Sequence, residues 1–239
     1  MDVSREIFLA VAAILSVILF FGLFYLLTER KVFNKLFGNR SASQESIDFI
    51  SVKLTGILLT GLLPFLVFIL AAGIPVSEIG MKYGNMNTIA YIIAGLTVIT
   101  IVSAYFSSKN RNVQRSAPEL RIKTWHPRHI LLSALGWLIY LFGYELLFRG
   151  ILWFLCFNAF GFWWSVIINV ALYSLVHIPK GKLMAYGAIP LGVLFCTLSY
   201  FTGSFLPAFL IHSAMAISTE LFSVYHNPDF QFVKSTPGK

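Results

Sequence analysis

Charged residues are scarce in this sequence. They make up 12% of the 239 residues, whereas hydrophobic residues make up 57%, and the mean hydropathy is +0.78. A soluble domain of this size cannot bury that much apolar surface, so the composition indicates an integral membrane protein. The net charge is +8, but no nucleic-acid-binding module is visible, so we expect no nucleic-acid partner. The partner expected from the composition is membrane lipid.

Cysteine is equally rare, and compact metal motifs are missing. Cys156 and Cys196 each stand in an apolar run, which excludes a disulfide framework and predicts two small core residues. No His-Glu-x-x-His sequence or other short zinc motif occurs. We therefore predict no metal site and no firm cofactor, although a carboxylate and two imidazoles on separate helices could bind Zn²⁺.

Long apolar runs, in contrast, are abundant. Ile7–Leu27 is 21 residues without a charge, which is enough to span a bilayer and too long for a signal-peptide core. Residues 54–72, with a kink at Pro64, and residues 88–108 predict a second and a third span.

Two further runs are too long for one span each. Residues 130–179 and residues 183–219 contain only two charged side chains between them. Gly161, between two phenylalanines, and Gly203, between Thr202 and Ser204, are the predicted breaks. The predicted fold class is all-α, a polytopic membrane helix bundle with about seven to eight transmembrane helices.

Positive charge predicts the orientation of these spans. With the N-terminus outside and the C-terminus inside, 14 of the 18 basic residues fall in inner loops or the tail, as the positive-inside bias requires. We expect a bacterial cytoplasmic membrane location. The basic residues assigned inside are Arg30, Lys31, Lys35, Arg40, Lys109, Arg111, Arg115, Arg121, Lys123, Arg128, Lys180, Lys182, Lys234 and Lys239.

The chain shows no internal repeat, and we treat residues 1–239 as a single membrane domain. Within it we distinguish an N-terminal three-helix half (1–128), a chemically richer core (129–225) and a C-terminal tail (226–239).

Four ionisable residues stand inside the predicted spans. Glu145 and Arg149 are four residues apart, so they share one face of a helix, and His177 and His212 lie in two other spans. Taken alone, Glu145 and Arg149 are interpreted as a buried ion pair whose charges cancel. Each histidine, taken alone, is interpreted as a hydrogen-bonded interior residue. Together, a carboxylate and two imidazoles are the groups needed to activate a water molecule in an apolar site.

The sequence resembles a known family at these residues. The segments are Tyr144-Glu145-Leu146-Leu147-Phe148-Arg149-Gly150, Tyr173-Ser174-Leu175-Val176-His177 and His212-Ser213-Ala214-Met215-Ala216. They are similar, in order, to the three motifs of the CPBP family, the CAAX prenyl protease and bacteriocin-processing membrane endopeptidases, also called Abi. The family pattern is EExxxR, then an aromatic residue four before a histidine, then His-xxx-Asn or Asp. The resemblance covers about residues 131–217.

The resemblance implies a helical bundle with an intramembrane proteolytic site. Glu145, Arg149, His177 and His212 match the second glutamate, the arginine and the two histidines of the motifs, and they are the candidate catalytic residues. Tyr144 and Tyr173 are the candidate substrate-binding residues. The implied substrate is a membrane-associated peptide or protein.

Two positions depart from the family pattern. Tyr144 stands where the first glutamate, the usual general base, is expected, and Ala216 stands where an asparagine or aspartate is expected. Adjacent residues of a helix point about 100° apart, so Glu145 does not simply replace the missing carboxylate. Loss of an oxyanion donor costs on the order of a hundredfold in rate or more.

Three functions are therefore weighed. The first is an endopeptidase that hydrolyses a peptide bond with a water activated by Glu145 and the histidines. The second is a catalytically impaired relative that acts as a membrane scaffold, regulator or bacteriocin-immunity protein. A small transporter using Glu145 as an ion site is the third, and the absence of inverted repeats disfavours it. If Glu145 turns away onto Arg149 and Tyr144 fills the gap between the two histidines, the hydrolytic site is broken and the second function is favoured.

Other polar and aromatic residues are given structural roles. The tryptophans at 137, 153, 163 and 164 are expected to serve as interface anchors or packing residues. The basic stretch 109–128 is read as a topology signal that contacts anionic lipid. Glu220 is expected to reach water near the inner end of its helix, without a functional role.

Overall fold

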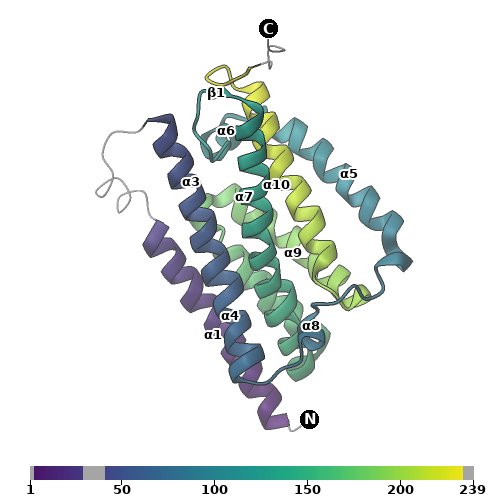
Figure 1. The fold of residues 1–239 in the computed structure, drawn as a ribbon. Helices are drawn as coiled ribbons and strands as arrows, with labels where there is room; N and C mark the ends of the chain where they lie inside the picture. The colour runs from purple at the N-terminus through teal and green to yellow at the C-terminus, as the bar shows by residue number, and fades with distance from the viewer. Residues whose placement is uncertain (1–2, 29–40, 234–239) are drawn as a thin grey trace. The chain divides into compact units, whose positions relative to one another are not determined.

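The computed structural model describes residues 3–28 and 41–233 of the chain, and its elements are almost all helical (Figure 1). Within these residues, six helices are long and apolar enough to cross a membrane. This confirms an all-α, polytopic integral membrane protein. The predicted basic residues at 30–40 and 234–239 lie outside the described residues.

The helices follow the apolar runs of the sequence. The first apolar run becomes α1, the second becomes the continuous stretch α3–η1–α4–η2, and the third becomes α5. The helices are α1 (Val3–Thr28), α3 (Ala42–Gly56), η1 (Ile57–Leu62), α4 (Leu63–Phe65), η2 (Leu66–Ala71), η3 (Val76–Ile79), η4 (Met86–Ile89), α5 (Ala90–Ser107), α6 (Arg111–Ser116), α7 (Pro127–Glu145), η5 (Leu146–Leu152), α8 (Trp153–Leu175), η6 (Ile178–Lys180), α9 (Lys182–Thr202) and α10 (Leu206–His226). The strands are β1 (Thr124–Trp125) and β2 (Gln231–Phe232).

Both predicted breaks fall at glycines with positive φ. Gly161 has φ 72° and ψ −177° and interrupts helical geometry within α8. Gly203 has φ 66° and ends α9 in the left-handed region, where its N–H donates to the Ser199 carbonyl. Side chains other than glycine rarely adopt such angles, which explains why these two positions punctuate the long apolar runs.

The chain forms two compact units. The first comprises Met1–Leu27, Gly56–Ala90 and Phe142–Phe209. The second comprises Thr28–Thr55, Tyr91–Leu141 and Leu210–Lys239.

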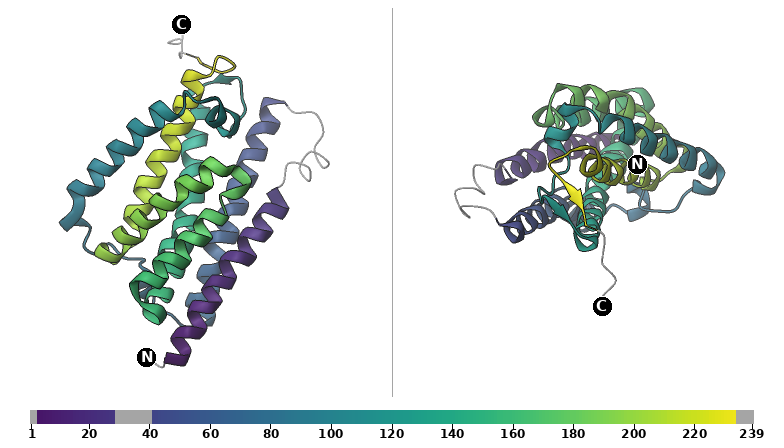
Figure 2. Two further views of the ribbon diagram at one scale, coloured as in Figure 1. Left: turned by 180° about the vertical axis from the view of Figure 1, so that it is seen from behind. Right: turned by 90° about the horizontal axis from the view of Figure 1, so that it is seen from above.

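In the first unit, α8 and α9 run side by side (Figure 2). The connector before α5 is fixed to the end of α9, because the Asn85 N–H donates to the Thr202 carbonyl at 2.9 Å and the Ser204 hydroxyl donates to the Lys82 carbonyl. Gly84 has φ 59°, and a Cβ there would lie 2.0 Å from the Thr202 carbonyl oxygen. Only glycine allows the connector to approach α9 this closely.

Close backbone contact also joins the middle of the first unit. Gly61 in η1 and Gly143 in α7 face each other, and a Cβ on Gly143 would lie 3.0 Å from the Gly61 Cα. Small residues allow membrane helices to pack backbone against backbone. Pro64 lies in a short α-helical turn, α4, between the π-helical turns η1 and η2.

In the second unit, the basic stretch 109–128 is more than a connecting loop. It contains α6 and β1, and β1 pairs in parallel with β2 near the C-terminus. Val113, Leu120, Ile122 and Trp125 are buried, so the stretch has an apolar core of its own.

An ionic cluster with two buried members, Lys53 and Glu220, holds this stretch to the helices of the second unit. The Lys53 ammonium lies 2.6 Å from a Glu119 carboxylate oxygen and 3.2 Å from the centroid of the Trp137 ring. The Glu220 carboxylate accepts a hydrogen bond from the Glu119 N–H at 2.8 Å. Glu220 is only 2% exposed, so the expectation that it reaches water was wrong. Glu119 and Glu220 lie 101 residues apart in the sequence, so no local sequence pattern could predict that they meet.

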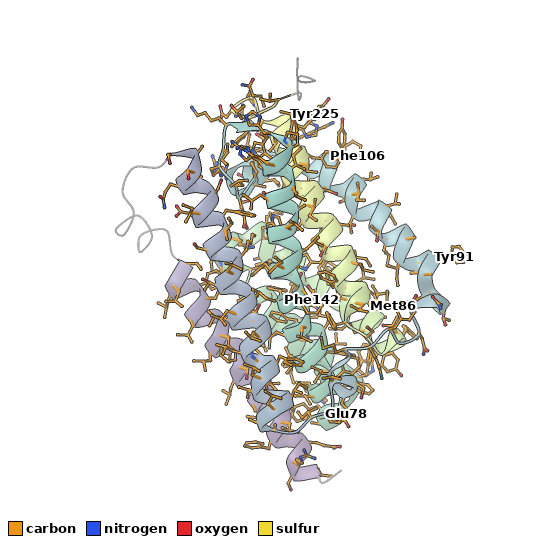
Figure 3. The ribbon with its side chains drawn as sticks, in the orientation of Figure 1. Glu78, Met86, Tyr91, Phe106, Phe142 and Tyr225 are labelled. Carbon is orange, nitrogen blue, oxygen red and sulfur yellow. The ribbon has the colours of Figure 1, made fainter. Side chains whose placement is uncertain are left out.

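Most of the exposed side chains of α5 are apolar. Tyr91 and Phe106, near its two ends, project away from the helix (Figure 3) and are 93% and 62% exposed. A helix with so many exposed apolar side chains needs a lipid environment, which agrees with its assignment as a membrane span.

Candidate active site

A buried ion pair lies at the centre of the first unit. α7 ends at Glu145, and the π-helical turn η5 follows and carries Arg149. The nearest Arg149 nitrogen (Nη1) lies 3.5 Å from Glu145 Oε2, and both side chains are 0% exposed. The predicted pairing is therefore present. The distance between Nη1 and Oε2 exceeds the 2.7–2.9 Å of a charge-assisted hydrogen bond. The contact is therefore chiefly an electrostatic attraction between two opposite charges in an apolar core.

Aromatic rings surround the Arg149 guanidinium. Its central carbon lies 4.1 Å from the centroid of Tyr173, 5.3 Å from Phe195 and 5.4 Å from Phe148. Such cation–π contacts gain strength when the cation is desolvated. A Cβ on Gly192 of α9 would lie 3.1 Å from the Val170 side chain and 3.3 Å from the Tyr173 ring, so this glycine lets α9 pack closely against α8.

Tyr144, at the position of the missing glutamate, belongs to an aromatic cluster. Its ring stacks on Phe148 at 4.9 Å and meets the edges of Phe21 at 5.4 Å and Tyr173 at 5.9 Å. The Tyr144 and His177 rings lie 6.3 Å apart. The phenol thus occupies the space beside the histidine, and it is 4% exposed.

His177 stands two residues after the end of α8, and its ring is held by a backbone carbonyl of that helix. Its Nδ1 lies 2.7 Å from the Tyr173 carbonyl oxygen. A carbonyl can only accept, so Nδ1 must donate, and the basic lone pair of the neutral ring lies on Nε2. The Tyr25 hydroxyl of α1 donates to the carbonyl of the preceding residue, Val176. The histidine ring is therefore oriented by the last turn of α8, and the residue that follows this helix is bound by α1.

The structure places the predicted site residues in both units. Tyr144, Glu145, Arg149, Tyr173 and His177 are neighbours in the first unit. His212 lies on α10 in the second unit, and it is buried with 7% exposure. In the described residues, no group of three or more histidine, cysteine or acidic side chains forms a metal site.

One further polar residue of this region escaped the sequence interpretation. Asn169, on α8, is 0% exposed, and its amide donates a hydrogen bond to the Phe148 carbonyl at 2.7 Å. An amide side chain in a long apolar run indicates a hydrogen-bonded interior position, because polar groups without a partner are costly in a membrane. Its partner, 21 residues away, could not be predicted.

Fold and site together define a polytopic membrane protein with a buried acid–base centre beside a histidine. Residues 125–218 match the family model described as Type II CAAX prenyl endopeptidase Rce1-like. This match confirms the predicted relationship to the CPBP family, and it covers the segment that carries all three motifs. No curated protein sequence and no solved structure matches the chain.

Proposed function

We propose that the protein is an intramembrane endopeptidase of the CPBP type, with Glu145 and His177 as catalytic groups. The observation that carries the proposal is the match of residues 125–218 to the family model, a segment that contains Glu145, Arg149 and His177. The roles of Arg149 and His212 follow from the family motifs, and the part of His212 rests on the resemblance alone.

In the proposed reaction, water attacks the carbonyl carbon of a peptide bond. The Glu145 carboxylate accepts a proton from that water, and the His177 Nε2 orients the water or the developing oxyanion. Arg149 balances the charge of Glu145, so that a carboxylate can remain ionised in an apolar core. The proton then passes to the leaving amine, and two peptide fragments result. In a water-poor site these electrostatic interactions are stronger than in bulk solvent.

The proposed substrate is a peptide or protein anchored at or in the membrane, and the surrounding lipid is the other partner. The matching family model is named for CAAX prenyl endopeptidases, which makes a prenylated peptide the first probe. We also propose the bacterial cytoplasmic membrane as the location, with the N-terminus outside and the C-terminus inside, on the distribution of basic residues.

The test is cleavage by purified protein in liposomes. Peptides with and without a C-terminal prenyl group are incubated with the wild type, with His177→Ala and with His126→Ala, and fragments are identified by mass spectrometry. His126 lies outside the proposed site and serves as the control. We expect cleavage by the wild type and by the control, and a loss of at least about a hundredfold in His177→Ala. Equal cleavage by all three proteins would remove His177 from the mechanism.

A second candidate is a catalytically impaired relative that binds a membrane peptide or protein as a scaffold, regulator or bacteriocin-immunity protein. Two observations favour it: Tyr144 packs among aromatic rings where the family has a glutamate, and Glu145 faces Arg149. This candidate predicts that wild-type protein binds its partner without producing fragments, and that His177→Ala leaves that binding unchanged.

A further inference from the structure

We propose that Asn169 is a positioning residue for the acid–base centre, acting through the carbonyl of Phe148. The proposal rests on the proposed function, and it adds to the reaction a residue that lies outside the family motifs. Asn169 touches neither Glu145 nor the substrate in this account. It acts on the turn of helix that carries Arg149.

Elementary chemistry fixes which group donates and which accepts in this hydrogen bond. The Asn169 amide nitrogen lies 2.7 Å from the Phe148 carbonyl oxygen, and the side chain is 0% exposed. Because a carbonyl can only accept, the amide must present its NH₂ group to it. Among the described residues, none donates to the buried Asn169 Oδ1. The side chain therefore acts in this structure through its NH₂ donor, and its unpaired oxygen carries an energetic cost.

The same carbonyl already belongs to an unusual turn. The Trp153 N–H donates to two carbonyls, that of Gly150 and that of Phe148, which is five residues earlier in the chain. This wide, π-helical spacing is uncommon and is often found at functional sites. The Phe148 carbonyl therefore accepts from two donors of α8, the N–H of its first residue, Trp153, and the side chain of Asn169, which lies beyond the break at Gly161. The Asn169 amide ties the wide turn to α8 at the residue directly before Arg149.

α8 contacts the turn at a second point, one helical turn further on. Tyr173 is four residues after Asn169, so both side chains lie on one face of α8. The Tyr173 ring lies 4.1 Å from the Arg149 guanidinium carbon. Asn169 thus holds the backbone at Phe148, and Tyr173 holds the side chain of the next residue. The two contacts fix the guanidinium, and the guanidinium is the ion-pair partner of Glu145.

The experiment replaces the amide by an apolar group of similar size, Asn169→Leu. Ser174→Ala is the matched control, because Ser174 also donates from α8 to a distant carbonyl, that of Ala185 on α9, at 2.8 Å. Hydrogen exchange of residues 146–153 is measured by mass spectrometry on both variants in liposomes. kcat and KM are measured on a peptide that the wild type cleaves, per molecule of folded protein.

We expect the backbone amides of residues 146–153 to exchange faster in Asn169→Leu than in the wild type. We also expect kcat to fall about tenfold with little change in KM. The control should leave both unchanged. Faster exchange with unchanged kcat would overturn the positioning role and leave only a structural contact. Unchanged exchange would overturn the whole proposal. If the wild type cleaves no peptide, the proposed function fails and the catalytic role of Asn169 falls with it, while exchange still decides whether the amide holds the turn.

Discussion

Removing one charge of the Glu145–Arg149 pair is expected to destabilise the protein by about 3–5 kcal/mol, because the other charge stays buried without compensation. The two single variants should differ. In Arg149→Met the remaining carboxylate can take up a proton and become neutral, whereas in Glu145→Gln the guanidinium stays charged. Glu145→Gln is therefore expected to be the more destabilising change.

The double variant Glu145→Gln/Arg149→Met is the control for this prediction. It removes both charges, so it should lose less stability than the sum of the two single losses. The free energy of unfolding in bicelles or mixed micelles measures all three variants. Strict additivity of the single effects would show that the two side chains do not compensate each other in the folded protein.

A large side chain at Gly143 is expected to destabilise the protein nearly as much as the loss of one charge of the Glu145–Arg149 pair. A Cβ there would already lie 2.7 Å from the Ile57 side chain and 3.0 Å from the Gly61 backbone. Gly143→Leu must push η1 and the end of α7 apart, and we expect a loss of about 3 kcal/mol. Because Gly143 directly precedes Tyr144 and Glu145, activity should fall as well.

Gly22 of α1 offers a matched control for this substitution. It lies in a helix of the same unit, and a Cβ there would meet nothing within 4 Å. Gly22→Leu should leave the free energy of unfolding within about 0.5 kcal/mol of the wild type, as is usual for exposed positions. Equal losses at the two glycines would mean that close helix contact is not what constrains Gly143.

The sequence predicted the parts of this molecule that depend on local physics. The apolar runs predicted the membrane helices, and Gly161 and Gly203 predicted the breaks because both adopt backbone angles that glycine favours. The spacing of Glu145 and Arg149 predicted their ion pair, since residues four apart share a helix face.

The features that were missed depend on contacts between distant segments. The amide of Asn169 meets a carbonyl 21 residues away, and the wide turn at Phe148 has no pattern of its own in the sequence. Glu220 is buried because it binds the backbone of Glu119, 101 residues earlier. Hydrophobic periodicity carries no information about which helix supplies such a partner.

The central claim is that Glu145 is the working carboxylate of a hydrolytic centre, and it is tested most directly by the cleavage rate of Glu145→Gln relative to the wild type. The rates are compared per folded molecule on the same membrane-bound peptide, with Glu78→Gln, outside the proposed site, as the control and with peptide binding measured in parallel. We expect Glu145→Gln to bind the peptide but to cleave it at least about a thousandfold more slowly than the wild type, while the control cleaves normally. Cleavage by Glu145→Gln at the wild-type rate would contradict the account.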